Sequence, residues 1–458
     1  MPPDGPQLAR RAWHAELAWL GSGVEPDVLI EAVGDRFTAV TPGTPPGDVP
    51  AGTTRLAGLT LPGLANAHSH AFHRALRGRT QLGEGAFWTW REQMYEAVAG
   101  LDPDSYRELA TGVYAEMALA GITSVGEFHY VHHSPGGAPY ADPNAMGHAL
   151  IEAARAAGIR ITLLDTCYLA GGIGKPMNET QRRFGDGDAE TWAARVEALR
   201  TAYAGATDVL VGTAIHSVRA VPVDQLPTVA KAAEQWSAPL HVHLSEQRAE
   251  NDACLAAYHR TPAQLLEQHG ALSPRTTAVH ATHLSQVDIE ILGDSRTCVC
   301  MCPTTERDLA DGIGAARCMF EAGSPIALGS DSQAVIDLFE EARAVELDER
   351  LSSERRGHWP AADLLLAATE AGHASLGRAD VGTLAAGHAA DFVTVDLDSV
   401  RLAGTEPRNA VESVVYAATS SDVRHVVVGG RVIVWEGVHL LVDEAPRRLG
   451  AAVRSLYA

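Results

Sequence analysis

Residues 66–78 read NAHSHAFHRALRG and follow the apolar run TRLAGLTLPGLA of residues 54–65. His68 and His70 lie two positions apart at the expected end of a strand, where such residues share a face. Packing against helices rarely suits two imidazoles, so we expect both to point into one polar site. His73 lies beyond the strand end, at an odd spacing from His68 and His70, so it does not share their face by strand parity. We therefore expect it to contact a substrate at most. The pattern alone also fits ordinary histidines at a strand end.

The rest of the chain repeats an apolar run followed by an amphipathic stretch. Helical patterns, several of them ending in glycine, separate most of the runs. Eight buried strands with intervening helices predict an α/β fold, a (β/α)8 TIM-like barrel. We expect strands within residues 59–68, 122–130, 159–168, 209–217, 239–246, 276–283, 297–304 and 325–332.

The two ends of the chain differ from its middle. Residues 1–61 and 381–458 carry short strand-like segments and turn formers, and neither end has enough strands for a domain of its own. We therefore predict one small β-sandwich built from both termini, with a catalytic barrel of residues 62–380 inserted between them.

Composition narrows the class of protein. Of the 458 residues, 46% are hydrophobic and 20% are charged, which is typical of a globular chain. The formal charge of −21 argues against nucleic-acid binding, which needs cations against phosphates. No apolar run reaches the length of a membrane span, and the first residues do not resemble a signal peptide. The six cysteines do not suggest a disulfide scaffold. We expect a cytoplasmic protein, and a homodimer from general frequencies.

Catalysis in such barrels takes place at the carboxyl ends of the strands. The expected ends carry a set of polar residues: His68, His70, Glu127, His129, Tyr130, His216, His241, His243, Glu246, His280, His283 and Asp331. A third histidine from the fifth strand and the aspartate from the eighth would complete a three-histidine, one-aspartate site. That set suits zinc with one position left for water.

Alternatives exist for several of these residues. His241 shares the expected face of His243 and could be the ligand in its place. Every second side chain of a buried strand shares a face, and this accounts for the spacing of Cys298, Cys300 and Cys302 without a thiolate metal site. We take the following as surface or core histidines: His129, His132, His133, His148, His259, His269, His373 and His388.

Four motifs, NAHSH, HVHLSEQ, VHATH and LGSDS, resemble the amidohydrolase superfamily in their order and spacing. Longer segments resemble its N-formimidoyl-L-glutamate deiminase family: HSHAFHRALRG, FWTWREQMY, GEFHYVHH, IHSVRAV, CPTTERDLADG and GSDSQAVIDLFEEAR. The resemblance spans nearly the whole chain, and FWTWREQMY is its most discriminating segment. It implies hydrolysis of N-formimidoyl-L-glutamate, a dianionic amidine, to N-formyl-L-glutamate and ammonia in histidine degradation.

The same resemblance implies roles for individual residues. One Zn²⁺ per subunit would be held by His68, His70, His243 and Asp331, and the catalytic groups would be Glu246, His280 and Asp331. Contacts to the substrate carboxylates would come from Arg91, Tyr130, His216 and Arg219. His73 stands where members often carry glutamine, so its contact is a departure from the family pattern. A lysine that bridges two metals is not expected, because Lys175 and Lys231 are the only lysines and neither ends a strand.

The expected chemistry starts from a water made acidic by zinc. Asp331 would take its first proton, His280 would hold the water, and Glu246 would protonate the leaving nitrogen. Three alternatives remain: a deaminase of a heterocyclic amine, a hydrolase of another formimidoyl or guanidino acid, and a metal-free barrel used in assembly. Residues 170–188, which are long and glycine-rich, are the candidate lid.

Overall fold

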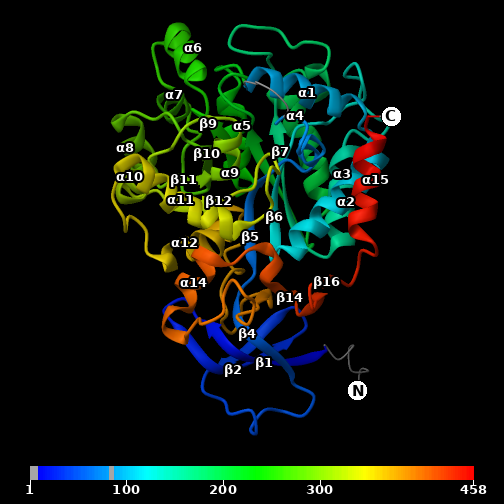
Figure 1. Ribbon diagram of the computed structural model, residues 1–458. Coiled ribbons are helices and arrows are strands. Elements are labelled where there is room, and N and C mark those ends of the chain that lie inside the picture. The colour runs from blue at the N-terminus through cyan, green and yellow to red at the C-terminus, as the bar shows by residue number, and fades with distance from the viewer. Residues whose placement is uncertain (1–8, 82–86, 458) are drawn as a thin grey trace.

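The computed structural model describes residues 9–81 and 87–457, and Figure 1 shows a barrel above a smaller β-domain. Eight parallel strands of the barrel lie side by side in chain order, and a bridge between Ser69 and Asp331 joins the two ends of the row. The predicted parallel barrel is confirmed. Its strands are β5 (Leu64–Ser69), β6 (Ile122–His129), β7 (Arg160–Cys167), β8 (Val209–Ile215), β9 (Leu240–Leu244), β10 (Thr276–His280), β11 (Cys298–Met301) and β12 (Ile326–Leu328).

Helices surround the barrel, and local sequence sets where they begin and end. The helix α2 begins after Asp102, whose side chain accepts a hydrogen bond from the Ser105 amide, while Pro103 occupies the first turn. The helix α3 ends at Gly158, which has a φ of 80°. The helices of the barrel are α1 (Phe87–Ala99), α2 (Pro103–Leu119), α3 (Ala145–Ala157), α4 (Ala189–Ala202), α5 (Leu226–Gln235), α6 (Arg248–Tyr258), α7 (Pro262–Gln268), α8 (Gln286–Asp294), α9 (Pro303–Asp308), α10 (Ala316–Ala322), α11 (Leu338–Ser353), α12 (Ala361–Ala368) and α13 (Glu370–Ser375).

The second domain is one mixed sheet to which both termini contribute, as predicted. Its strand order is β16-β15-β14-β13-β4-β1-β2-β3. Phe37 of β3 and Phe392 of β13 have ring centroids 6.5 Å apart although three strands separate them in the sheet, so the sheet curls around its own core. The strands are β1 (Arg10–Trp19), β2 (Val24–Val33), β3 (Arg36–Thr41), β4 (Thr54–Pro62), β13 (Phe392–Val395), β14 (Val423–Val428), β15 (Arg431–Trp435) and β16 (Val438–His439).

The run predicted as one strand at residues 59–68 is two strands in the structure. The sheet strand β4 ends at Pro62, Gly63 intervenes, and the barrel strand β5 begins at Leu64. A Cβ atom at Gly63 would lie 2.3 Å from the Thr123 hydroxyl oxygen, so the close approach to β6 requires glycine. This direct passage places the β5 histidines at the far end of the barrel from the β-domain.

Several contacts join the barrel to the terminal segments. The buried Arg160 guanidinium donates to both carboxylate oxygens of Asp391 at 2.7 and 2.9 Å, linking β7 to the residue before β13. The helix α15 (Ala445–Ser455), red in Figure 1, lies against α2 on the barrel. The last part of residues 381–458 therefore contacts the barrel, and so does α14 (Ala410–Ala417), which lies against α11 and α12. Within the described ranges, no helix combines the length and the apolar character needed to cross a membrane.

Candidate metal centre and active site

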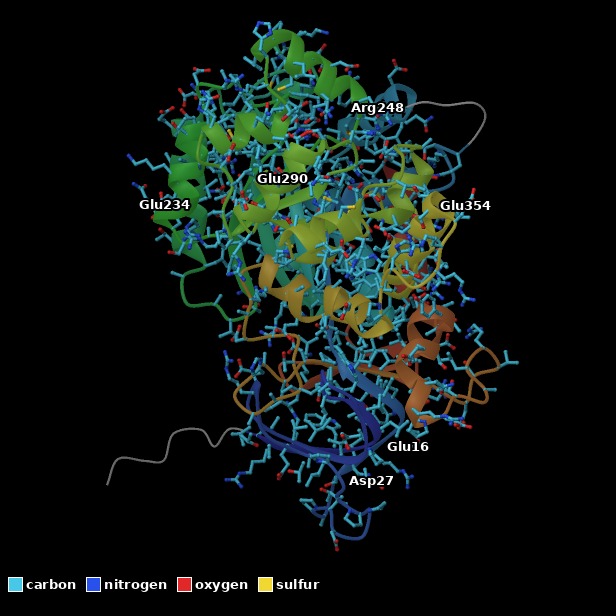
Figure 2. The ribbon with its side chains drawn as sticks, turned by 90° about the vertical axis from the view of Figure 1, so that its left-hand side faces the viewer. Glu16, Asp27, Glu234, Arg248, Glu290 and Glu354 are labelled. Carbon is cyan, nitrogen blue, oxygen red and sulfur yellow. The ribbon has the colours of Figure 1, made fainter. Side chains whose placement is uncertain are left out.

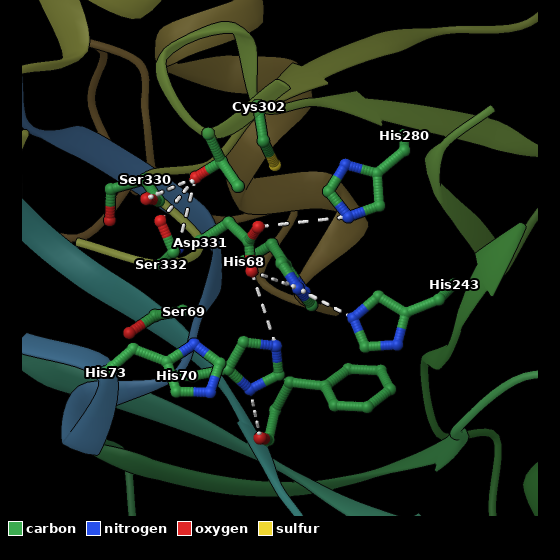
Figure 3. A network of polar contacts seen from close by, with 12 residues as sticks. His68, Ser69, His70, His73, His243, His280, Cys302, Ser330, Asp331 and Ser332 are labelled. Carbon is green, nitrogen blue, oxygen red and sulfur yellow. Dashed lines mark hydrogen bonds and ion pairs between the residues drawn. The ribbon is translucent and has the colours of Figure 1, made fainter. Parts of the chain in front are cut away.

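Two histidines from the end of β5 meet one carboxylate from the end of β12. The Nε2 atoms of His68 and His70 lie 3.3 and 3.4 Å from the same oxygen, Oδ1 of Asp331. His243, on β9, reaches the same place, with its Nε2 atom 3.1 Å from that of His68. Figure 3 shows these side chains turned toward Asp331. Four residues from three distant segments of the sequence thus converge at the mouth of the barrel.

Backbone carbonyls fix how two of these imidazoles point. His70 Nδ1 hydrogen-bonds the Phe128 carbonyl, and His243 Nδ1 hydrogen-bonds the His216 carbonyl, both at 2.9 Å. With their protons on Nδ1, both rings direct the Nε2 lone pair into the site. The backbone of Asp331 is also tied to β5, because its amide donates to the His68 carbonyl at 3.0 Å.

The geometry fits a bound divalent ion. The Nε2 atoms of His68 and His243 lie 3.1 Å apart, and the buried Nδ1 atom of His68 has no hydrogen-bond partner that would occupy its other side. Two nitrogens bound to one tetrahedral zinc at about 2.05 Å lie about 3.3 Å apart. Burial lowers the pKa of His68 to about 3 and also lowers the pKa of His70 and His243, which keeps the rings in the neutral, ligating form. Burial alone would raise the pKa of Asp331, but His68, His280 and His70 lower it.

His280, at the end of β10, faces the same carboxylate from the other side. Its Nε2 atom lies 3.8 Å from Asp331 Oδ2 and 3.9 Å from Glu246 Oε1, and its Nδ1 atom lies 3.3 Å from Glu306 Oε1. Burial alone would lower the pKa of His280, but Glu306, Glu246 and Asp331 raise it to about 10. The ring can therefore donate a proton or a hydrogen bond into the site.

Three groups of potential ligand atoms overlap at this centre, and two of them share Asp331. His68, His243, His280 and Asp331 offer ligand atoms that all lie within 4.8 Å of one another. His70 forms such a group with His73 and Asp331 instead. The four-residue group around Asp331 therefore has His280 as its third imidazole, while His70 approaches the same carboxylate from the side of His73.

Two connected cavities lead to this centre. The inner one, about 70 Å³, reaches the metal centre and is lined by all five predicted substrate contacts: His73, Arg91, Tyr130, His216 and Arg219. The outer one, about 340 Å³, shares the walls formed by Arg91, Tyr168, His216 and Arg219. Residues 170–173 and Lys175 of the predicted lid line the outer cavity. Glu246 and His280 lie at the inner end, so the structure brings the predicted catalytic and substrate residues together.

Neighbouring side chains hold several of these residues in place. Arg219 Nε lies 2.9 Å from Glu250 Oε2, and its Nη2 atom lies 3.4 Å from Glu246 Oε2. His73 Nε2 and the Tyr130 hydroxyl are 3.1 Å apart and hydrogen-bonded. Arg219 and the His73–Tyr130 pair are thus oriented by other side chains of the protein.

Two buried carboxylates with clear contacts to the site have no role in the sequence analysis. Glu306 lies within CPTTERDLADG and contacts His280, and Glu250 lies one helical turn after Glu246 and contacts Arg219. A glutamate one turn after a candidate catalytic glutamate was the available signal. Nothing in the local sequence identified the partner of either residue.

Other histidines and the cysteines are used elsewhere. His241 shares the strand of His243, but its Nε2 atom hydrogen-bonds the Ser375 carbonyl at 3.0 Å, away from Asp331. Cys298, Cys300 and Cys302 pack among barrel residues in the interior, and of the three only Cys302 comes within 4.8 Å of ligand atoms of His280 and Glu306. His129 and His132 form a buried group with Asp165, whose carboxylate is already bound at 2.8 and 2.9 Å by Arg195. We interpret that group as a structural ion-pair network.

Comparison with known proteins agrees with this geometry. The pattern of the Amidohydrolase family matches residues 59–433. The chain is 37% identical over 407 residues to the formimidoylglutamate deiminase of Pseudomonas aeruginosa, covering 86% of this chain and 89% of the relative. It is 30% identical to a 5-methylthioadenosine/S-adenosylhomocysteine deaminase of Halobacterium salinarum, covering 94% and 93%. The crystal structure of an amidohydrolase from Brucella melitensis superposes with a TM-score of 0.91 at 32% identity, covering 98% and 100%. The chain therefore belongs to the amidohydrolase family.

Proposed function

We propose that this chain hydrolyses N-formimidoyl-L-glutamate to N-formyl-L-glutamate and ammonia, as a zinc-dependent step of histidine degradation. One observation carries the proposal: Arg91 and Arg219 line the cavity that ends at the His/Asp centre. In a chain with a formal charge of −21, such local cations are what an anionic substrate needs. The 37% identity to a formimidoylglutamate deiminase supports the same substrate.

In this proposal His68, His70, His243 and Asp331 hold one zinc ion. Three imidazoles and a carboxylate are donors that zinc takes, and a water would be a fifth ligand. Zinc at this position would supply a Lewis acid that lowers the pKa of water from about 15.7 toward 7. His280 lies outside this proposed set, and its contact with Glu306 leaves Nε2 facing the site.

The chain's own groups would manage the protons. Asp331 Oδ2 faces His280 rather than the paired histidines, so this oxygen is placed to take the first proton from water. Glu246, 3.9 Å from His280, would pass a proton to the leaving nitrogen so that ammonia departs. His280 would hold the attacking water and stabilise the charge that develops.

Binding of the two substrate carboxylates would fall to the cavity walls. The guanidinium of Arg219 matches a carboxylate in shape and charge, and Glu250 already fixes its Nε side. Arg91 lies on α1 within FWTWREQMY and lines both cavities. His216, Tyr130 and His73 would add hydrogen bonds. Here the His73–Tyr130 pair takes the place of the usual glutamine.

A second candidate is deamination of a purine nucleoside derivative, which the Halobacterium salinarum relative favours at 30% identity. Trp90, Tyr168 and Phe184 line the inner cavity and could stack on a ring. The charge of the lining favours the first candidate, because Arg91 and Arg219 can form ion pairs with two carboxylates but not with a neutral ring.

Ammonia release from a substrate panel tests the proposal. The purified chain is given N-formimidoyl-L-glutamate, N-formimidoyl-L-aspartate, a guanidino acid and 5-methylthioadenosine, with and without a chelator. We expect turnover with the first compound, strongest among the four and lost on chelation. Turnover of the nucleoside alone would establish the second candidate. The cytoplasmic location and the homodimer both remain predictions. Light scattering of the purified protein would test the dimer.

A further inference from the structure

The outer cavity carries a cation that neither the motifs nor the proposed chemistry uses. Lys175 lines it together with Arg91 and Arg219. We propose that Lys175 completes an anion subsite in the outer cavity and binds the substrate carboxylate farther from the amidine. This subsite rests on the proposed function in one respect, the dianionic character of the substrate.

A compact turn fixes the backbone of Lys175, whose side chain is exposed at the edge of the cavity. The Gly171 amide donates to the Lys175 carbonyl and the Lys175 amide donates to the Gly172 carbonyl, both at 2.9 Å. A Cβ atom on Gly171 would lie 2.3 Å from the Pro176 carbonyl oxygen, and Gly174 has a φ of 67°. The lysine stem lies over Gly172, 3.5 Å from where a Cβ atom would be. Glycine at these positions allows a turn that other residues would strain.

The turn is anchored beside the predicted carboxylate-binding arginine. The amides of Leu169 and Ala170 donate to the carbonyl of Ala220, the residue after Arg219, at 2.7 and 2.8 Å. At the other end of the loop, the buried Gln181 side chain donates to the Tyr168 hydroxyl at 2.8 Å. Lys175 and Arg219 are therefore held on one wall by short backbone connections.

The charge of the lining favours an anion. Among the described residues of the outer cavity, Glu250 is the only carboxylate, and Arg219 already pairs with it at 2.9 Å. Arg91 and Lys175 then leave the lining with excess positive charge. A lysine ammonium on a flexible stem suits a carboxylate at the end of a flexible substrate, since it bonds from many directions.

The sizes of the two cavities point to the same division of the substrate. The inner cavity, at about 70 Å³, is about a fifth of the outer cavity at about 340 Å³. The amidine must reach the centre at the inner end, so the distal part of a dicarboxylate extends into the outer cavity. That part ends on the wall that carries Lys175.

The chain offers a matched control for this test. It has two lysines, and the second, Lys231, is exposed on α5 and does not line either cavity. Limited acetylation of the metal-loaded protein with acetic anhydride, read by mass spectrometry, gives a rate for each lysine in one sample. We expect glutarate at saturating concentration to slow acetylation of Lys175 several-fold and to leave Lys231 unchanged. Equal rates with and without glutarate at Lys175 would overturn the subsite.

Kinetics give the second reading. We expect Lys175→Met to raise KM for N-formimidoyl-L-glutamate about 5- to 10-fold, the value of one partly exposed charge-assisted hydrogen bond, with kcat little changed. Lys175→Arg should recover most of this loss, and Lys231→Met should alter neither constant. An unchanged KM in Lys175→Met would also overturn the subsite. If the unaltered protein fails to release ammonia, the proposed function fails, whereas glutarate protection of Lys175 still tests the subsite by itself.

Discussion

The Nδ1 atom of His280 lies 3.3 Å from Glu306 Oε1, so a buried carboxylate holds from behind the imidazole that faces the reaction centre. The same Glu306 oxygen accepts a hydrogen bond from the Cys302 amide at 2.9 Å, which fixes the carboxylate itself. The orientation of His280 therefore depends on a residue that lines neither cavity.

We expect Glu306→Gln to lower kcat about 10- to 100-fold, the usual cost of removing such an orienting partner, with little change in KM. The reason is that an amide holds the His280 ring less firmly and no longer favours its protonated form. The pH profile of kcat should therefore shift along the pH axis as well as reach a lower maximum. Glu290→Gln, on the exposed face of α8 (Figure 2), is the control and should match the unaltered protein. A normal kcat and pH profile in Glu306→Gln would show that Glu306 does not position His280.

Glu246→Gln should lose most of kcat, about 10²- to 10⁴-fold, while metal content stays the same. Glutamine keeps the size of the side chain but cannot carry a proton to the leaving nitrogen. Metal analysis alongside the kinetics separates this loss from a loss of the ion. Near-normal turnover would remove Glu246 from the role of proton shuttle.

Arg219→Ala should raise KM for the dianionic substrate steeply, about 30- to 100-fold, because a paired, charge-assisted contact is worth roughly 2–3 kcal/mol. The substitution also leaves Glu250 buried without its cation, so thermal melting has to be followed in parallel. Arg219→Ala/Glu250→Gln removes that second effect. Arg248→Ala, at the exposed start of α6 in Figure 2, is the matched control. Unchanged kinetics in the double variant would place Arg219 outside the substrate site.

Glu127 should make stability depend on pH. Burial raises its pKa from 4.5 to about 7, although the Ala71 amide and the Ser69 hydroxyl donate to its carboxylate. The folded chain then binds this proton more tightly than the unfolded chain, so the stabilisation is complete below about pH 4.5 and is lost as the pH rises through 7. The loss amounts to about 3 kcal/mol.

Denaturant unfolding between pH 5 and 8 measures this effect. Stability of the unaltered protein should fall relative to Glu127→Gln as the pH rises, because glutamine does not titrate. Glu234→Gln, exposed on α5 (Figure 2), should follow the unaltered protein. Parallel curves for Glu127→Gln and the unaltered protein would contradict the raised pKa.

Much of the fold follows from sequence periodicity. Buried strands of a parallel barrel are continuous apolar runs, so each of the eight was visible, even β12 with only three residues, Ile326–Leu328. The break at Gly63 was not visible, because it depends on Thr123, about sixty residues away in the sequence. The crossing of α15 onto the barrel has the same kind of cause: its contact partner, α2, lies near the other end of the chain.

The site shows a similar limit. The meeting of His68 and His70 at one carboxylate was predictable, since strand parity fixes which side chains share a face. Parity could not separate His241 from His243, because depth in the barrel decides which one reaches Asp331 and which one reaches Ser375. The partners of His280 and Arg219 are Glu306 on α9 and Glu250 on α6, and only the folded chain brings each pair together.

Metal content per chain is the most direct test of a shared ion at Asp331. Protein purified with zinc supplied should hold about one zinc per chain, and His243→Ala and Asp331→Ala should hold far less. His241→Asn, two residues from His243 on the same strand, is the matched control and should keep the ion. We predict this pattern, with melting curves confirming that each variant is folded. Full zinc content in a folded Asp331→Ala would contradict the centre described for this barrel.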